Sequence, residues 1–365
     1  QRQMLTMGGK YNWNEHTKIR FEGASTKNDV NTFSTLDRED DDGYGFTMGI
    51  DNELPITNRS SIVSLVEYEY IDQNFSPIER YRAVEFERYW NTAILNIPTN
   101  VEQHIVSVGT GLKNDQVGGI HYTFSNYTRG TFYEGVKNRI HGNARIEKFH
   151  LTGDASILNT TGVQKSSFVN HKANIHRDLG FVTLGVREEK EQSSVFVQTT
   201  DSLQSSSFDF QVWEAYATNS DTNSNFFRFS YLHRVDLKPA SDQISFNNAT
   251  VAEEFNGQYE LMNYRNFQLK TRATYREMRI KDTTHISLEP EENLLGRVDV
   301  NVRFIKRVFN FQSYYEIGSG LELRKDIIYV VDEINGTHIW NDYNNDSIQQ
   351  VNEFEVAVFP ERGTH

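Results

Sequence analysis

The stretch RVDVNVRF, residues 297–304, decides the fold of this chain. Its apolar side chains occupy every second position, namely Val298, Val300, Val302 and Phe304. Polar side chains fill the positions between them, at Asp299, Asn301 and Arg303. Successive side chains of a β-strand point to opposite faces of a sheet. The stretch therefore predicts a strand with one apolar face and one polar face.

The same alternation recurs along the chain, for example in FFRFSYLHRVDL (226–237) and NFQLKTRATY (266–275). The predicted strands are long, about 9 to 14 residues against a usual mode of about 5 to 6. Polar turns separate them, and we predict an up-and-down antiparallel meander across roughly 100–330. The first third is less regular, with strands expected at 10–24 and 44–52.

Composition excludes several classes of protein. The 365 residues carry 37 basic and 50 acidic side chains, and the net charge of −13 argues against a nucleic-acid partner. Cysteine is absent, which excludes disulfides, thiolate metal sites and cysteine nucleophiles. The hydrophobic content is only 37%, yet aromatic residues reach 13%, and disordered chains are poor in aromatic residues.

Long amphipathic strands, many aromatic residues and low overall hydrophobicity are typical of an outer-membrane β-barrel, whose interior is polar. At roughly 20 residues for each strand and turn, the chain would supply about 16 to 18 strands. The alternative is a soluble surface or periplasmic β-sandwich that binds glycan or protein. An envelope hydrolase would need a clustered acid pair, and Glu85 with Glu87 is the one weak candidate.

One segment has helical signals. In SPIERYRAVEFERYW (76–90), Ser76 could cap a helix, Pro77 fits the first helical position, and Glu79 completes a capping box. The charged side chains of this segment are expected to form an ion-pair network on a barrel wall or plug; they are Arg80, Arg82, Glu85, Glu87 and Arg88.

The tail FNFQSYYEIGSGLELRKDIIYVVDEINGTHIWNDYNNDSIQQVNEFEVAVF (309–359) resembles a segment of very large outer-membrane barrel proteins from Bacteroidetes, distantly similar to the SprA-type translocons of type IX secretion. The stretches EFERYWN (85–91) and NTFSTLDREDDDGYGF (31–46) also look like parts of such proteins. The resemblance implies an envelope β protein longer than this chain. Ser347 departs from the pattern, which has Gly at that position.

The stretch NDYNNDSIQQVNEFE (341–355) has the spacing of a calcium loop. Such a loop takes oxygen ligands from positions 1, 3, 5, 7, 9 and 12. These positions are Asp342, Asn344, Asp346, the carbonyl of Ile348, Gln350 and Glu353. Three carboxylates predict weak, structural Ca²⁺ binding, with a dissociation constant of about 10⁻⁴ to 10⁻³ M. The alternative is an Asx-rich turn between two strands.

We therefore expect an all-β protein with a long-stranded antiparallel meander, forming an outer-membrane β-barrel or a large segment of one. A single domain would span residues 1–365 and contain the calcium-type loop at 341–355. The expected function is transport, protein translocation or envelope assembly, without enzymatic activity. The expected partners are outer-membrane lipid and other envelope or secretion proteins, with localisation in the outer membrane or at the surface of a Gram-negative bacterium.

Overall fold

The chain divides into two compact units, residues 1–320 and residues 321–365. The computed structural model describes residues 2–29, 40–93, 97–98, 100–219, 225–264, 266–282, 290–304, 309–319, 338–344, 347, 349–350 and 353–357.

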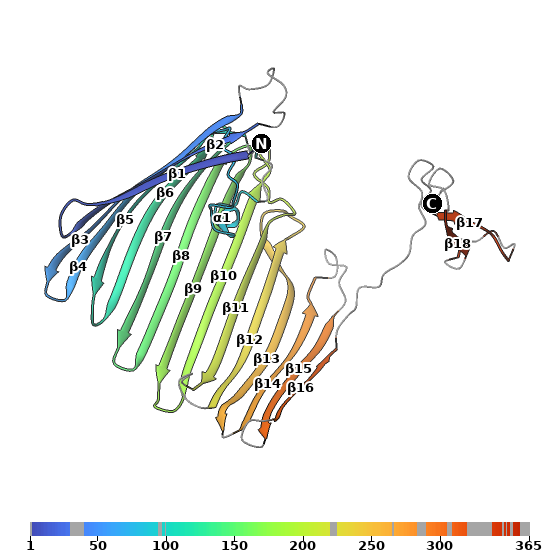
Figure 1. Cartoon of the computed structure of the whole chain (residues 1–365). Helices are drawn as coiled ribbons and strands as arrows, with labels where there is room; N and C mark the ends of the chain where they lie inside the picture. Colours follow the sequence, from blue (N-terminus) through green and yellow to red (C-terminus); the bar gives the residue numbers. More distant parts are fainter. Residues whose placement is uncertain are drawn as a thin grey trace. The chain divides into compact units, whose positions relative to one another are not determined.

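The first unit is one antiparallel sheet of 16 strands in sequence order, which confirms the predicted long-stranded meander and its strand number. Figure 1 shows the strands side by side. The strands are β1 (Arg2–Asn12), β2 (Thr17–Asn28), β3 (Asp42–Thr57), β4 (Ser60–Ile71), β5 (Gln103–Asn114), β6 (Gly118–Arg129), β7 (Tyr133–Ile146), β8 (Phe149–Gly162), β9 (Lys165–Asp178), β10 (Thr183–Phe196), β11 (Phe208–Thr218), β12 (Asn225–Pro239), β13 (Phe246–Tyr264), β14 (Phe267–Ile280), β15 (Glu291–Phe304) and β16 (Phe309–Gly318).

The meander begins earlier than the sequence predicted. The expected strand at 10–24 is two strands, because the chain turns between β1 and β2. The Trp13 amide donates to the Thr17 carbonyl over 3.0 Å, and the Asn14 side chain accepts from the His16 amide over 2.8 Å. Asparagine favours such turns because its side chain can bond to the backbone two residues on.

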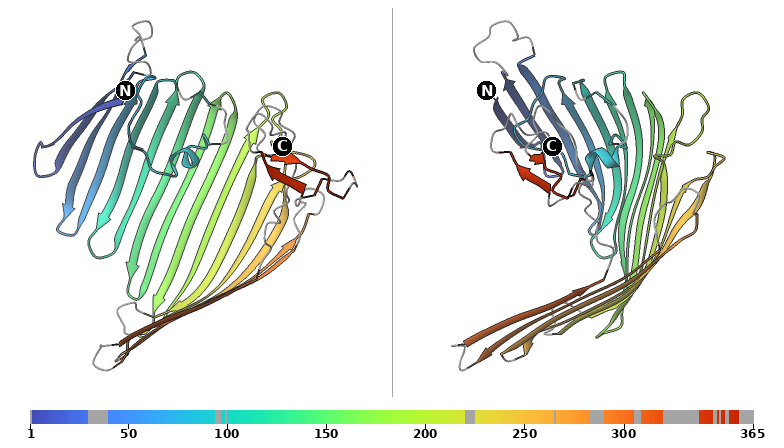
Figure 2. Two further views of the ribbon diagram at one scale, coloured as in Figure 1. Left: turned by 45° about the vertical axis from the view of Figure 1, so that its right-hand side comes forward. Right: turned by 90° about the vertical axis from the view of Figure 1, so that its right-hand side faces the viewer.

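Alternate hairpins meet at opposite rims of the sheet. The described hairpins β1–β2, β3–β4, β5–β6, β7–β8 and β9–β10 lie at the lower rim in Figure 1, and the described connections β6–β7, β8–β9 and β10–β11 lie at the upper rim. Within the described residues, β1 pairs only with β2 and β16 only with β15, so the sheet has two open edges. The sheet is strongly curved, as Figure 2 shows.

The connection between β4 and β5, residues 72–102, folds back over the concave face of the sheet; we call it the inward segment (Figure 2). It contains one short helix, α1 (Phe86–Tyr89). The helix predicted over 76–90 is therefore wrong for most of its length. The Ser76 amide donates to Thr26 Oγ1 of β2 over 3.1 Å, and contacts with the sheet replace the expected helical cap.

The principal buried core lies between the inward segment and the concave face, which we call the inner face. Trp90 of the segment packs against side chains from neighbouring strands. Its ring centroid lies 5.1 Å from that of Tyr127, and Phe86 adds a second edge-on contact to Tyr127 at 5.5 Å. The other buried members of the cluster are Tyr133, Leu158, Phe168 and Val195. An apolar patch on an otherwise polar face thus holds the segment in place.

The second unit contains a short antiparallel hairpin in its described part. Strand β17 (His338–Trp340) pairs with β18 (Phe354–Val356), with Trp340 opposite Phe354. The calcium-type loop predicted from the sequence connects these two strands.

The position of Trp90 predicts a large effect of its removal. Trp90 is 5% exposed. Trp90→Ala should lower the free energy of opening the inward segment by about 3–5 kcal/mol, because apolar burial is lost and a cavity is left behind. The rate of trypsin cleavage after the exposed Arg80 measures how often the segment opens. The neighbouring Tyr89 is 43% exposed, so Tyr89→Ala is the matched control and should change the free energy of opening by less than about 0.5 kcal/mol. Equal rates in the two variants would contradict the packing described here.

Candidate functional site

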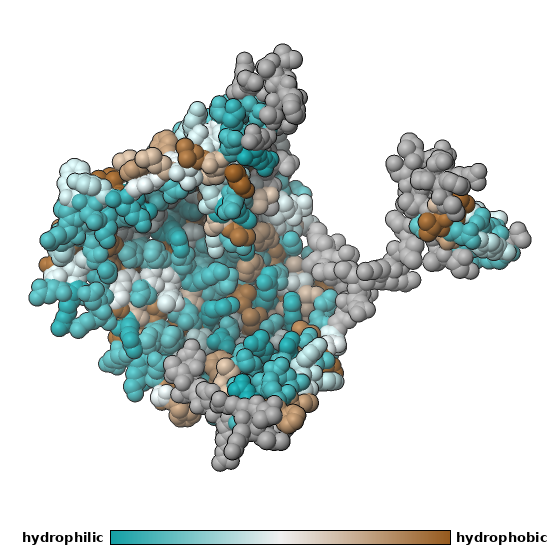
Figure 3. Space-filling model, viewed as in Figure 1, coloured by the Kyte–Doolittle hydropathy of each residue, from teal (hydrophilic) through white to brown (hydrophobic). Residues whose placement is uncertain are grey.

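The inner face and the inward segment together form the candidate site. Figure 3 shows that the face carrying the segment is predominantly hydrophilic. Charged side chains recur there at every second position of several strands, for example Arg187, Glu189 and Glu191 of β10. The segment lies across these strands, so a solute moving along the inner face would meet it.

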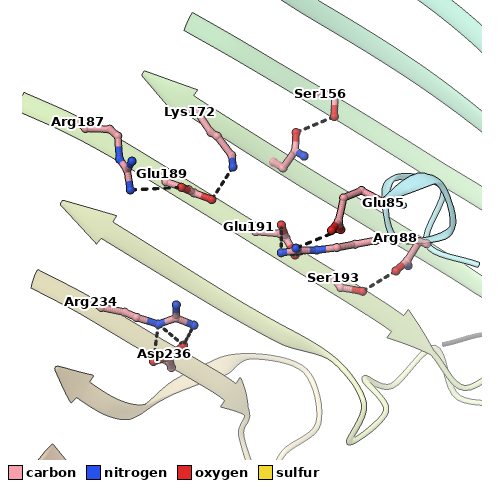
Figure 4. A network of polar contacts seen from close by, with 12 residues as sticks. Glu85, Arg88, Ser156, Lys172, Arg187, Glu189, Glu191, Ser193, Arg234 and Asp236 are labelled. Carbon is pink, nitrogen blue, oxygen red and sulfur yellow. Dashed lines mark hydrogen bonds and ion pairs between the residues drawn. The ribbon is translucent and has the colours of Figure 1, made fainter. Parts of the chain in front are cut away.

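A bidentate ion pair fixes α1 to the middle of the sheet (Figure 4). Arg88 donates from Nε and Nη2 to Glu191 Oε1 over 3.1 and 2.8 Å, and from Nη2 to Glu191 Oε2 over 2.7 Å. Glu191 is only 3% exposed, so its carboxylate depends on this partner for charge compensation. The hydrogen bonds to Glu191 raise the pKa of the Arg88 guanidinium above its ordinary value.

Neutral hydrogen bonds hold the residues that follow α1. The side-chain amide of Asn91 donates to Ser166 Oγ of β9 over 2.9 Å and accepts from Ser193 Oγ of β10 over 3.1 Å. The Tyr133 hydroxyl donates to the Trp90 carbonyl over 2.5 Å. The ammonium group of Lys137 lies 3.7 Å from the centroid of a Trp90 ring, a cation–π contact. Side chains of three strands, β7, β9 and β10, therefore converge on Trp90 and Asn91.

Arg82 anchors the earlier part of the segment. Its Nε donates to Glu69 Oε1 of β4 over 3.0 Å, and its Nη1 donates to Gln103 Oε1 of β5 over 2.7 Å. The guanidinium carbon also lies 4.1 Å from the centroid of the Phe86 ring. A planar guanidinium suits this combination of a carboxylate, an amide and an aromatic face, which a lysine could not reproduce.

The contacts can be compared with the ion-pair network that the sequence predicted for this segment. Glu85 lies 3.5 Å from Arg88, and Glu87 lies 3.6 Å from Arg129 of β6, so each carboxylate has its own cation. Arg80 instead donates to the backbone carbonyls of Ala83 and Val84. The network is real, but its strongest partners are sheet residues far away in the sequence rather than members of the segment.

Ion pairs also line the inner face beyond the segment (Figure 4). Lys172 lies 2.8 Å from Glu189, and Arg234 lies 2.7 Å from Asp236 two positions further along its strand. A cavity of about 350 Å³ lies beside α1 among these groups. Its charged lining residues are Arg88, Arg187, Glu189, Arg234, Glu254 and Arg276. The arrangement presents both signs of charge to a solute in the cavity.

The sequence patterns contained part of this information. Arg187 with Glu189, Arg234 with Asp236 and Arg297 with Asp299 are opposite charges two residues apart, which places both members on one face of a strand. That pattern could have indicated the lined inner face. The partnership of Arg88 with Glu191 joins residues 103 positions apart, and no local signal points to it.

The predicted calcium ligands lie in the second unit, away from this site in the sequence. Asp342, Asn344, Gln350 and Glu353 fall within the described residues, whereas Asp346 and Ile348 lie outside them. Among the described residues, no group of three or more His, Asp or Glu side chains is arranged to hold a metal ion. In that same part of the chain, no helix is long and apolar enough to cross a membrane.

Comparison with solved structures finds a distant likeness to a bacterial protein. The crystal structure of Pseudomonas aeruginosa OccK9 (OpdG) is similar with a TM-score of 0.35 and 10% sequence identity, over 88% of this chain and 91% of that chain. No protein-family model matches the chain, and no curated protein matches it. A likeness of this degree carries no argument about function, which must come from the residues themselves.

The bond between Arg88 and Glu191 should show energetic coupling. A double-mutant cycle with Arg88→Ala and Glu191→Gln should give a coupling energy of about 1.5–3 kcal/mol, which is the range for hydrogen bonds to charged groups. Chymotrypsin cleavage after Tyr81, which is exposed on the segment, provides the measurement. The matched cycle of Arg80→Ala with Glu191→Gln should give no coupling energy, because Arg80 donates to backbone carbonyls and not to Glu191. Additive effects of the Arg88 and Glu191 changes would show that the ion pair does not hold the segment.

Proposed function

We propose that this chain forms the wall of a non-enzymatic outer-membrane channel, which the inward segment narrows. The proposal starts from the face opposite the inner face, which we call the outer face. Every strand of the sheet places an exposed apolar or aromatic side chain there. One such residue from each strand, in order, is Met7, Phe21, Met48, Val66, Val108, Ile120, Ile140, Leu151, Ile175, Val186, Trp213, Phe229, Phe255, Tyr275, Val298 and Ile317.

A continuous apolar surface of this extent has a high cost in water. Lipid would cover it without cost, and a transmembrane barrel needs an outward apolar band flanked by aromatic residues. Tyr231, Phe255 and Tyr275 are aligned across three neighbouring strands of the outer face. Polar outer-face residues such as His171 and Glu188, 2.8 Å apart, lie near the middle of β9 and β10. We infer that the band adjoining the lower rim meets lipid and that the strands extend beyond it at the upper rim.

The two open edges are the second support for a barrel. Unpaired backbone groups cost several kcal/mol each in the hydrocarbon region, so a sheet in a membrane must have no free edge. With 16 alternating strands, β1 and β16 run antiparallel to each other. Their directions therefore permit direct pairing into a closed barrel, and they equally permit insertion of an even number of further antiparallel strands.

The main support for a channel function is the position of the inward segment on a charged inner face. A wall that only anchored a protein would have no need of a lined, polar interior. Here ion pairs line the interior, and Arg88 with Glu191 holds a segment across it. A solute would pass through the space that the segment leaves, and the paired charges would select against apolar solutes.

Two observations concern the class of molecule that passes through the proposed channel. The resemblance of residues 309–359 to SprA-type proteins supports protein translocation, with outer-membrane lipid and other envelope or secretion proteins as partners. An interior narrowed by a firmly anchored segment supports passage of small solutes instead, unless the segment is displaced. The soluble sandwich is less well supported, because the described residues form one large sheet and a short hairpin rather than two packed sheets.

Thiol labelling tests the membrane part of the proposal. The sequence has no native cysteine, so only the introduced thiol can react. Leu151 and Thr152 are adjacent in β8, both are exposed, and they lie on the outer and inner faces respectively. In proteoliposomes, a small water-soluble maleimide should label Thr152→Cys and leave Leu151→Cys unlabelled. Both should be labelled in denaturant. Equal labelling of the two in the folded protein would indicate a soluble sheet and favour the glycan- or protein-binding alternative.

Conductance tests the channel part. The purified chain in planar lipid bilayers should give discrete current steps, and Trp90→Ala should enlarge them because the segment no longer holds its place across the interior. Tyr89→Ala, with its exposed side chain, should conduct like the unaltered chain. If the protein passes the labelling test but never conducts, the membrane barrel is supported and the channel function is contradicted. Insensitivity of the step size to Trp90→Ala would exclude the segment as the constriction.

A further inference from the structure

We propose that the loop between β17 and β18 is a Ca²⁺ site, in which Glu353 is a buried ligand that closes the loop. This inference is independent of the channel proposal, because it concerns the second unit alone. The starting observation is the side chain of Glu353, which is 1% exposed. A carboxylate so deeply buried needs compensation for both of its oxygens.

Only one of the two oxygens has it among the described residues. Oε2 accepts from the indole nitrogen of Trp340 over 3.0 Å and lies 3.4 Å from the amide nitrogen of Gln350. Oε1 is buried and has no hydrogen-bond partner in the described part of the chain. The carboxylate thus lies between the end of β17 and the loop position of Gln350, with one oxygen unsatisfied. A cation in the loop would satisfy it.

At Ser347 the loop backbone has the conformation that such an ion requires. Ser347 occupies the sixth position, where calcium loops turn sharply and normally have Gly, and its φ is +60°. Its amide donates to Asp342 Oδ2 over 2.9 Å, which links the sixth position of the loop to the carboxylate of the first. A serine bears the left-handed conformation at a cost of about 1–2 kcal/mol. The chain adopts this turn in spite of the residue type.

The hairpin fixes the two ends of the loop. The Asn341 amide donates to the Glu353 carbonyl over 2.8 Å, directly beyond the pairing of Trp340 with Phe354. The first and twelfth positions, Asp342 and Glu353, are therefore held at the base of a two-stranded hairpin. In an EF-hand, helices do this instead. Of the remaining ligand positions, Asn344 and Gln350 are described, and Asp346 and Ile348 lie outside the described residues.

The chemistry of the donors favours Ca²⁺ over Mg²⁺. The spacing offers carboxylate, amide and carbonyl oxygens, and a glutamate at the twelfth position can bind through both oxygens. Ca²⁺ accepts such irregular sets of six to eight oxygens, whereas Mg²⁺ demands near-octahedral geometry and retains its waters. With three carboxylates, the expected dissociation constant is about 10⁻⁴ to 10⁻³ M, as in extracellular modules.

Terbium luminescence of the purified full chain provides the test. Tb³⁺ takes the same oxygen ligands as Ca²⁺, and the ring of Trp340, bonded to Glu353, is close enough to sensitise its emission. We expect saturable emission on excitation of tryptophan, displaced by millimolar Ca²⁺ and not by the same concentration of Mg²⁺. Absence of saturable emission, or equal displacement by Mg²⁺, would overturn the proposal.

Variants locate the ion. Glu353→Gln and Asp342→Asn should each weaken binding by more than about ten-fold, since loss even of an outer-shell partner costs about 10- to 100-fold. Asp342→Asn keeps an acceptor for the Ser347 amide, so its effect does not depend on loss of the folded loop. The matched control is Glu355→Gln, because Glu355 lies in the same hairpin and accepts from Tyr343 instead. Emission that survives Glu353→Gln, or that is lost equally in the control, would refute the assignment.

Ser347→Gly gives a test in the opposite direction. Glycine adopts positive φ without steric cost, so the closed loop should form more readily and bind Tb³⁺ and Ca²⁺ several-fold more tightly. Weaker binding in this variant would show that the loop does not close around an ion in the conformation described here.

Discussion

Side chains alternate across a β-strand, and in this chain the alternation exposes apolar residues on one face of a 16-stranded sheet. Within the described residues, nothing covers that face. The opposite face carries the inward segment and the ion pairs that hold it, so the two faces cannot exchange roles. A register slip by one residue would reverse both faces of a strand at once, which fixes the pairing strongly. The rest of the structure follows from this separation.

A second consequence concerns the position of the core. In a soluble protein the apolar faces pack against one another, but here the principal buried cluster lies on the polar side, under the inward segment. Trp90 and Phe86 supply its apolar part, and Arg82 and Arg88 supply polar anchors around it. The buried aromatic side chains stabilise the segment on the sheet, while the buried Glu191 determines where Arg88 must lie. The segment is therefore an element with its own stability inside the hollow of the sheet.

The hairpin of the second unit applies the same physical rule on a small scale. A buried charged group requires a partner, and Glu191 has Arg88. Glu353 has an indole and an amide on one oxygen only, and the proposed ion would complete its environment. One carboxylate is thus compensated by a residue from a distant part of the chain, and the other, in our proposal, by solvent-borne Ca²⁺.

The sequence by itself determined the all-β class, the long strands, the order of the meander and the approximate strand number, because each rests on period-two alternation and on the polar turns between the strands. It also determined the spacing of the loop at 342–353. Only the tertiary structure decided that residues 86–89 alone are helical, that Arg88 meets Glu191, and that Glu353 is buried with one oxygen unpaired. Those features depend on contacts between residues far apart in the chain, and local patterns contain no information about which distant strand a side chain will meet.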